Sequence, residues 1–265
     1  MPAAPLLDLI GNTPLVPVTR LDTGPCELLL KLESQNPGGS IKDRIAVSMI
    51  EAAERDGQLA PGGTIVEATA GNTGLALALV GLAKGYRCLF VIPDKMSQEK
   101  IFHLRALGAE IVMTRSDVGK GHPEYYQDMA EAIAARTPNS VYINQFANPA
   151  NPLAHERTTG PELLRQTGGR LDAVVCGVGS GGTITGLARC FRARAPQVKL
   201  VLADPAGSVL ADYVRSGTIG AAGSWLVEGI GEDFLPPIAD LSGVAQAYTI
   251  ADGESFSAAR ELLRQ

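Results

Sequence analysis

Short apolar runs rich in β-branched residues alternate along the chain with longer segments of helical periodicity, and this alternation restricts the fold most. It is typical of parallel sheets covered by helices, because a crossover between parallel strands usually contains a helix. Most of the runs are apolar throughout, as strands buried on both faces are. The predicted strands are residues 28–32, 64–68, 87–92, 110–114, 141–145, 173–177 and 199–203.

Helical segments between these runs carry start and stop signals. Residues 41–56 have apolar side chains at intervals of four, between a predicted N-cap at Ser40 and a closing glycine at Gly57. Residues 73–84 are apolar nearly all round and predict a buried helix. Residues 206–250, with scattered glycine and proline, are the least regular part and predict a loop that could move over a site.

The composition suits an enzyme scaffold. The chain has 265 residues, is 45% hydrophobic and 19% charged, and so falls outside the disordered, collagen-like and low-complexity classes. A formal net charge of −5 leaves no global positive field to hold nucleic acid or an anionic membrane. Because the sequence has neither an apolar run of about 18 residues nor a basic and then apolar leader, we expect a cytoplasmic protein.

Cysteine and histidine give no metal or disulfide pattern. The cysteines form no C-x-x-C pair and fall mostly in apolar runs, which favours reduced core thiols. These cysteines are Cys26, Cys88, Cys176 and Cys190. The histidines are too scattered for a metal cluster, and a surface or structural role is expected for His103, His122 and His155.

A lysine follows a glycine pair at the start of the predicted helix over residues 41–56. In Asn36-Pro-Gly-Gly-Ser-Ile-Lys-Asp-Arg, Lys42 falls in the first helical turn, where the positive end of the helix dipole disfavours an ammonium group. An amine with a destabilised proton is a better nucleophile and can form a Schiff base with an aldehyde cofactor. For an isolated lysine, a solvated position in the first helical turn would be the simpler interpretation. The two motifs that follow are therefore what favours a Schiff-base role for Lys42.

A second motif, Glu67-Ala-Thr-Ala-Gly-Asn-Thr-Gly, joins a predicted strand to the buried helix. Helix N-termini of this kind bind carboxylate or phosphate through backbone N–H groups. The hydroxyls of Thr69 and Thr73 and the amide of Asn72 add side-chain donors. A tight strand-to-helix turn with a cap explains the same residues equally well.

A third motif, Gly177-Val-Gly-Ser-Gly-Gly-Thr-Ile-Thr-Gly, again follows a strand, and its amides and hydroxyls suit a single phosphate. It also contains G-x-G-x-x-G through Gly177, Gly179 and Gly182, and Asp204 ends the next strand, as in a dinucleotide-binding fingerprint. An NAD-dependent oxidoreductase therefore stays an alternative. Such an enzyme gives no reason for the motifs around Lys42 and Asn72.

In their order and spacing, the three motifs resemble the fold-type II pyridoxal-phosphate enzymes of the cysteine synthase and cystathionine β-synthase family. The resemblance runs from Ile10-Gly-Asn-Thr-Pro-Leu to the end of the sequence. It implies a two-domain α/β fold (tryptophan synthase β-like), with mostly parallel sheets covered by helices. It further implies a large cofactor-binding domain of residues 1–40 and 146–265, and a small mobile substrate-carboxylate domain of residues 41–145.

Site residues follow from this resemblance, position by position. Lys42 would carry the cofactor, pyridoxal 5'-phosphate, as an internal aldimine, and Asn72 would donate a hydrogen bond to the cofactor's ring oxygen. The residues implied to hold the phosphate are Gly179, Ser180, Gly181, Gly182 and Thr183. The residues implied to receive the substrate carboxylate are Thr69, Ala70, Gly71, Thr73 and Gln145.

The resemblance implies a β-replacement enzyme of cysteine biosynthesis or transsulfuration, in which serine or O-acetylserine loses its β-substituent and a thiol adds at Cβ. Segments 94–100, 151–155 and 228–234 look more like cystathionine β-synthase, which uses homocysteine, than like sulfide-using cysteine synthase, which stays the alternative. A non-catalytic binding protein is more remote. Small amino-acid and thiol substrates are the expected partners, and a homodimer is the expected assembly.

The sequence departs from the family pattern at several positions. Ala70 stands where many members have serine, which removes a hydroxyl donor to the carboxylate, and Phe146 replaces a tyrosine common in the cystathionine branch. The sequence has no haem-binding extension or regulatory module, and it ends at Gln265, before a glycine-rich segment whose serine meets the pyridine nitrogen. From these features we expect a C-terminally shortened member with low activity or poor cofactor retention.

Overall fold

The structure is a computed structural model that describes residues 5–69, 71–96 and 98–264. The chain divides into two compact units. The first unit comprises Met1–Thr13 and Glu33–Ala150, and the second comprises Pro14–Leu32 and Asn151–Gln265. The division into domains that the resemblance implies stays a prediction.

The first unit is built on a parallel four-stranded sheet with the strand order β5-β4-β3-β6. The central strand β3 pairs in parallel with β4 on one side and β6 on the other. The strands of this sheet are β3 (Thr64–Glu67), β4 (Arg87–Pro93), β5 (Glu110–Thr114) and β6 (Ser140–Tyr142). The helices of this unit are η1 (Leu6–Leu9), η2 (Glu33–Gln35), α1 (Lys42–Arg55), α2 (Asn72–Lys84), α3 (Gln98–Ala106) and α4 (Tyr126–Arg136).

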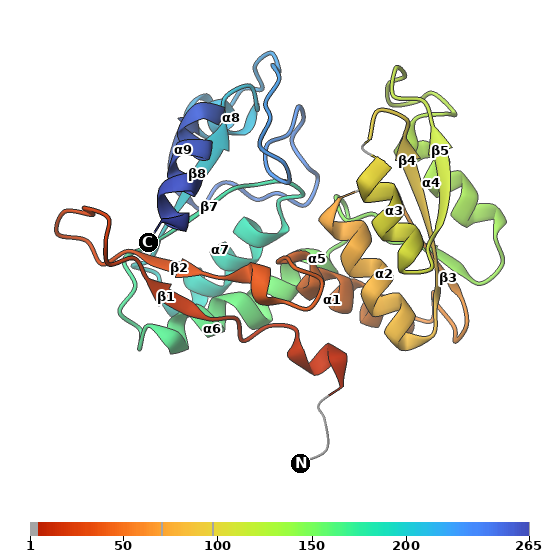
Figure 1. The fold of residues 1–265 in the computed structure, drawn as a ribbon, viewed down its shortest axis with the longest axis horizontal. Helices are drawn as coiled ribbons and strands as arrows, with labels where there is room; N and C mark the ends of the chain where they lie inside the picture. Colours follow the sequence, from red (N-terminus) through yellow and green to blue (C-terminus); the bar gives the residue numbers. More distant parts are fainter. Residues whose placement is uncertain (1–4, 70, 97, 265) are drawn as a thin grey trace. The chain divides into compact units, whose positions relative to one another are not determined.

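Helices cover both faces of this sheet (Figure 1). Gly81 of α2 lies against Ile65 of β3, whereas Val66 belongs to a core cluster with Ile133 of α4. Successive side chains of a strand point to opposite faces, so α2 and α4 lie on opposite sides of β3. Every residue of β3 is buried, as the apolar run predicts.

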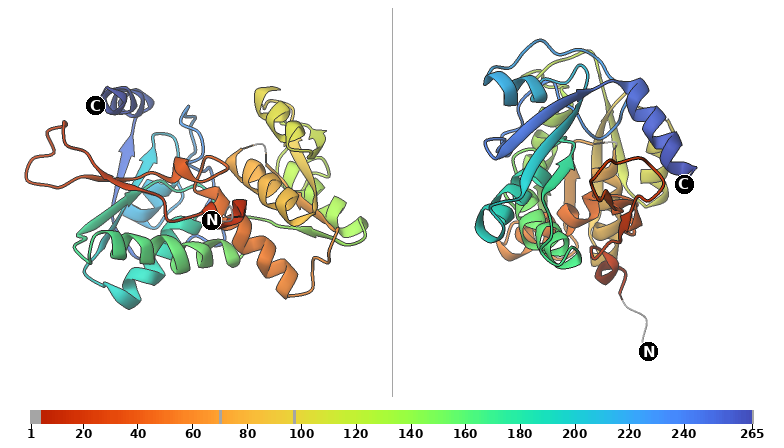
Figure 2. Two further views of the ribbon diagram at one scale, coloured as in Figure 1. Left: turned by 60° about the horizontal axis from the view of Figure 1, so that its bottom comes forward. Right: turned by 90° about the vertical axis from the view of Figure 1, so that its left-hand side faces the viewer.

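The second unit contains an antiparallel pair, β1-β2, and a parallel sheet with the order β7-β8-β9 (Figure 2). Its strands are β1 (Leu15–Pro17), β2 (Leu29–Lys31), β7 (Ala173–Cys176), β8 (Lys199–Pro205) and β9 (Val244–Ile250). Its helices are α5 (Ala150–Ala154, which begins at the boundary between the units), the π-helix η3 (His155–Thr159), α6 (Gly160–Gln166), α7 (Gly182–Arg194), α8 (Leu210–Ser216) and α9 (Asp252–Leu263).

The core of the second unit forms where α7 and α8 pack on β8. Ile184 and Leu187 of α7, Leu202 of β8 and Leu210 of α8 belong to one buried cluster. Outside this cluster, Val175 of β7 is 63% exposed. Most of the predicted strands were expected to be buried on both faces, and β7 departs from this expectation.

Several other predictions from the sequence need correction. The irregular stretch 206–250 contains α8 and the strand β9 instead of one long loop, and β2 pairs antiparallel with β1 outside the parallel sheets.

Cys26 is exposed, although Cys88 and Cys190 are buried free thiols. Burial raises the pKa of the Cys88 thiol to about 12. In the part of the chain that the structure describes, no helix is long and apolar enough to cross a membrane.

Candidate active site

Lys42 is the first residue of α1, and a short turn fixes its backbone. Its N–H donates to the hydroxyl of Ser40 at 3.2 Å, and the Gly38 N–H donates to the Asp43 carboxylate. Ser40 is not the N-cap that the sequence predicts, because Ile41 occupies that position, yet its hydroxyl still serves the first turn. Gly57, with φ of 70°, ends the helix as predicted.

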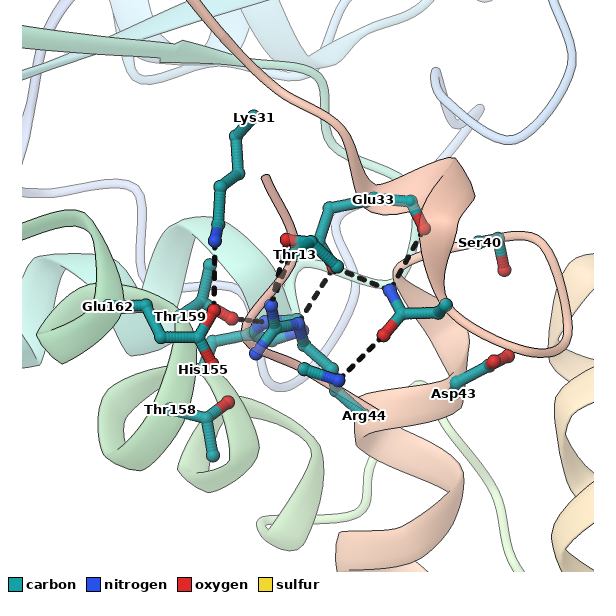
Figure 3. A network of polar contacts seen from close by, with 12 residues as sticks. Thr13, Lys31, Glu33, Ser40, Asp43, Arg44, His155, Thr158, Thr159 and Glu162 are labelled. Carbon is teal, nitrogen blue, oxygen red and sulfur yellow. Dashed lines mark hydrogen bonds and ion pairs between the residues drawn. The ribbon is translucent and has the colours of Figure 1, made fainter. Parts of the chain in front are cut away.

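A buried ion pair anchors the first turn of α1 (Figure 3). Arg44 Nε lies 2.7 Å from Glu33 Oε2, and a terminal nitrogen of Arg44 lies 2.8 Å from Glu33 Oε1. Thr13 donates its hydroxyl to the same carboxylate at 2.6 Å. Asn36 donates to Glu33 at 3.0 Å and accepts the Gly11 N–H at 2.8 Å. The Gly-Asn-Thr-Pro segment near the N-terminus thus helps to position the helix that begins at Lys42.

Two carboxyl groups near this turn have shifted pKa values. Burial alone would raise the pKa of Glu33, but the hydrogen bonds and charge of Arg44, with hydrogen bonds from Thr13 and Asn36, hold it below its usual value. Burial raises the pKa of Asp43, against a hydrogen bond from Gly38 and together with the negative charge of Glu33. Near Lys42, the ionised form of Glu33 is therefore favoured, whereas the ionised form of Asp43 is disfavoured.

The carboxyl ends of β3 and β6 carry the residues predicted to receive a substrate carboxylate. Thr73, in the first turn of α2, donates its hydroxyl to Gln145 Oε1 at 2.7 Å, and both side chains are buried. The Thr69 hydroxyl accepts the Gly71 N–H at 3.2 Å. Ligands in parallel α/β sheets bind at this edge, beyond the carboxyl ends of the strands. Ala70 lies outside the described residues.

Asn72 is the first residue of α2, and its side chain is exposed. The preceding Gly71 has the extended backbone conformation typical of a helix N-cap. Lys42 and Asn72 therefore occupy equivalent positions at the starts of α1 and α2, two helices of the same unit that pack against each other.

Glu67, the last residue of β3, is a group to which the sequence analysis assigned no role. It is fully buried, and its carboxylate accepts the N–H groups of Ala68 at 2.8 Å and Gln145 at 3.1 Å. Burial raises its pKa to about 7, against these two hydrogen bonds and one from the Asn144 N–H. A charged residue inside the run Thr64-Ile-Val-Glu was the signal that could have identified it.

In the second unit the glycine-rich turn Gly179–Thr183 leads from β7 into α7, as predicted. Gly181 adopts φ of 88°, a conformation that favours glycine, and a Cβ at Gly182 would collide with the Asn151 side chain. The turn is tightly supported, since Ser180 accepts a hydrogen bond from Asn151 at 3.0 Å. The first turn of a helix leaves N–H groups without partners inside the helix, which suits a phosphate.

His155 supports the same turn from the π-helix η3. Its Nε2 lies 3.2 Å from the Thr183 hydroxyl, and its Nδ1 lies 2.9 Å from the Thr159 hydroxyl. The side chain is 1% exposed. Of the two roles left open by the sequence, the structural one therefore holds for His155, whereas His103 and His122 are exposed.

Asp204 is poorly placed for the ribose contact that a nicotinamide enzyme requires. It is fully buried, and its carboxylate accepts the Ala211 N–H of α8 at 2.8 Å. Burial raises its pKa, against hydrogen bonds from Ala211, Ser208 and Leu210. The geometry thus gives Asp204 a structural role, which disfavours the dinucleotide interpretation.

A cavity of about 590 Å³ in the same unit is lined by Arg20, Ser257, Arg260, Glu261 and Arg264 and contains none of the predicted site residues.

Comparison with known proteins agrees with the features described above. Residues 6–265 match the family described as "Pyridoxal-phosphate dependent enzyme". Cystathionine beta-synthase from Rattus norvegicus is 45% identical over 98% of this chain and 47% of its own length. Cysteine synthase 1 from Neurospora crassa is 48% identical over 95% of this chain and 68% of its own length.

A solved structure gives the same result. A hydrogen sulfide-producing enzyme from Fusobacterium nucleatum superimposes with a TM-score of 0.88 at 36% identity, covering 98% of this chain and 85% of that one. Parallel sheets with glycine-rich turns at their carboxyl ends, together with this match, define an α/β protein of the fold-type II class. The chain belongs to the family of pyridoxal-phosphate-dependent enzymes. It spans about half the length of the curated cystathionine beta-synthases that it matches.

Proposed function

We propose that the chain binds pyridoxal 5'-phosphate and catalyses β-replacement, condensing serine or O-acetylserine with homocysteine to give cystathionine. The reaction releases water from serine or acetate from O-acetylserine. The observation that carries the proposal is the buried pair Thr73–Gln145 at the carboxyl ends of β3 and β6, beside the start of α2. Because the Thr73 hydroxyl donates to Gln145 Oε1, the donor set for an amino-acid carboxylate consists of the Gln145 side-chain NH₂ group and the N–H groups at the start of α2.

The residues present fit the cofactor. Gly181 and Gly182 leave no room for side chains in their turn, so backbone N–H groups can approach a phosphate there. Lys42 would hold the cofactor's aldehyde carbon, Asn72 its ring oxygen, and the turn Gly179–Thr183 its phosphate. When bound, the cofactor supplies an electron sink for the negative charge that develops at the substrate Cα.

The chain's own residues bind the substrate, transfer its proton and exclude water. Thr69, Gly71, Thr73 and Gln145 bind and orient the substrate carboxylate, which fixes Cα and its proton. The Lys42 amine would remove the proton from Cα and later return a proton there. Closing the carboxylate loops over the substrate would exclude water, so that the incoming thiol is the nucleophile at Cβ.

Cysteine synthase, which joins O-acetylserine and sulfide to give cysteine, is the second candidate. The identity of 48% to a cysteine synthase favours it as much as the identity of 45% favours the cystathionine reaction. Product identification by mass spectrometry, with each donor supplied with each thiol, decides between them. Formation of cystathionine that is lost in Lys42→Ala supports the proposal, and absence of product with every pair overturns it.

A further inference from the structure

Glu67 is a buried acid at the centre of the first unit, and it has no role in the proposed reaction mechanism. It ends β3, the strand with neighbours on both sides, and its side chain has no exposed surface. Burying a carboxylate is costly unless hydrogen bonds compensate for its lost hydration. The hydrogen-bond donors around the Glu67 carboxylate therefore indicate the function of this residue.

The donors to Glu67 are backbone N–H groups from two loops. Oε1 accepts the Ala68 N–H at 2.8 Å, and Oε2 accepts the Gln145 N–H at 3.1 Å. The N–H of Asn144 also contributes. Asn144 has φ of 50°, a conformation uncommon outside glycine, and successive N–H groups in such a turn form a concave anion site. The carboxylate thus joins the loop after β3 to the loop after β6.

Both loops carry the proposed carboxylate donors. Ala68 begins the segment that leads through Thr69 and Gly71 to Thr73, and the Gln145 side chain accepts the hydrogen bond from Thr73. Glu67 holds the backbone of Gln145, while Thr73 holds its side chain. The position of the Gln145 amide therefore depends on Glu67 from one side and on α2 from the other.

We propose that ionised Glu67 is a positioning residue that aligns Ala68–Thr69, after β3, with Asn144–Gln145, after β6, for binding the substrate carboxylate, and that its protonation weakens this binding. A neutral acid is a weaker acceptor for the N–H groups that face its two oxygens, since it has lost its negative charge and one oxygen carries a proton. The inference rests on the proposed function, because it assigns the substrate carboxylate to these loops.

The surroundings of Glu67 allow this titration near neutral pH. Burial raises its pKa to about 7, and the opposing influences are the backbone N–H groups of Ala68, Gln145 and Asn144. The titratable groups on the elements packed against β3 are Tyr142 of β6, Arg87 and Cys88 of β4, Lys84 of α2, and Tyr126, Asp128, Glu131 and Arg136 of α4. Tyr142 senses the charge, since burial and then Glu67 raise its pKa. Lys84, Arg87 and Arg136 lie toward the amino ends of the strands, away from Glu67.

The test compares the loaded full chain with Glu67→Gln, which keeps the shape of the side chain but cannot ionise. Glu110→Gln, at an exposed position of β5 in the same sheet, is the matched control. We expect Glu67→Gln to raise the KM for the amino-acid donor about tenfold at pH 8.5 with kcat changed less. The ratio of the two KM values should fall to within about twofold at pH 5.5, because wild-type Glu67 is then neutral as well. Taking the ratio cancels the effect of the substrate's own titration on KM.

A second readout does not depend on turnover. Amide chemical shifts of Ala68, Asn144 and Gln145 should titrate together with a midpoint near pH 7 in wild type and in Glu110→Gln, and should not titrate in Glu67→Gln. A KM ratio that does not change with pH, or amides that do not titrate, overturns the positioning role. Absence of product at every pH is instead the failure of the proposed function. In that case the affinity of each protein for L-serine is measured from the Gln145 side-chain amide shift. If Glu67→Gln binds L-serine more weakly than wild type by the same factor at every pH, or if neither protein binds it, the role of Glu67 is overturned.

Discussion

Thr73 and Gln145 are 72 positions apart in the sequence, yet the threonine hydroxyl donates to the glutamine Oε1 at 2.7 Å in a buried environment. The bond connects the first turn of α2 with the loop that follows β6. Because both elements belong to one parallel sheet and its covering helix, two segments that are remote in sequence form one donor set at the carboxyl edge.

Replacing Thr73 with valine removes this hydrogen bond while keeping the shape of the side chain. We expect the KM for the amino-acid donor to rise about threefold to tenfold, the value of one hydrogen bond, with a smaller change in kcat. Thr73→Ser keeps the hydroxyl and should bind substrate nearly as wild type does. Steady-state kinetics checks both, and equal KM values for the valine and serine variants would contradict the assignment.

Lys42→Ala should abolish β-replacement and the covalent retention of the cofactor, because α1 contains no other lysine that could supply the amine. The measurement is visible absorbance of the protein after dialysis, together with product formation. Lys199→Ala, at the exposed first residue of β8, is the control and should keep both properties. Normal turnover in Lys42→Ala would remove the role proposed for this lysine.

Strong local signals made much of the fold predictable. The buried strands β3 and β4 are centred on apolar runs, Ile65–Val66 and Cys88–Ile92, and α1 has its apolar residues at intervals of four up to Gly57. The strand β9 was missed because its residues, Val244–Ile250, follow a region rich in glycine and proline and are mostly exposed or half-buried. Such a strand gains its stability from pairing with β8, which a local pattern does not reveal.

The site shows the same contrast. The motifs around Lys42, Asn72 and Gly179 could be found because each is contiguous and lies at a strand-to-helix or loop-to-helix junction. Glu33 and Arg44 pair across 11 positions, and Glu67 meets the Gln145 N–H across 78. Contacts of this kind depend on the tertiary fold. A single sequence provides only an indirect sign of them, such as a charged residue inside an apolar strand.

Gly182→Ala should destabilise the second unit, because its Cβ would collide with the Asn151 side chain. Overpacking of this kind costs about 1–3 kcal/mol in unfolding free energy, and the distorted turn should also weaken retention of pyridoxal 5'-phosphate. Gly253→Ala in the first turn of α9 faces open space and should leave stability unchanged or slightly raised. Urea unfolding and equilibrium dialysis measure both effects, and equal behaviour of the two variants would contradict the close packing at Gly182.

The ion pair between Glu33 and Arg44 predicts a specific dependence of stability on pH. The Arg44 side chain is 1% exposed, so Glu33→Gln leaves a buried guanidinium without its carboxylate and should cost about 3 kcal/mol at pH 7. The pKa of Glu33 is lower in the folded protein than its usual value of 4.5, so the stabilisation is present above pH 4.5 and is lost as the pH falls through the folded pKa. Urea unfolding from pH 7 to pH 3 should therefore show the wild-type and Glu33→Gln stabilities converging at the acid end. Glu124→Gln, which breaks an exposed pair with Arg115, should leave stability nearly unchanged at every pH, because water screens this pair. A constant difference between wild type and Glu33→Gln over the whole range would mean that the charge of Glu33 is not what anchors the start of α1.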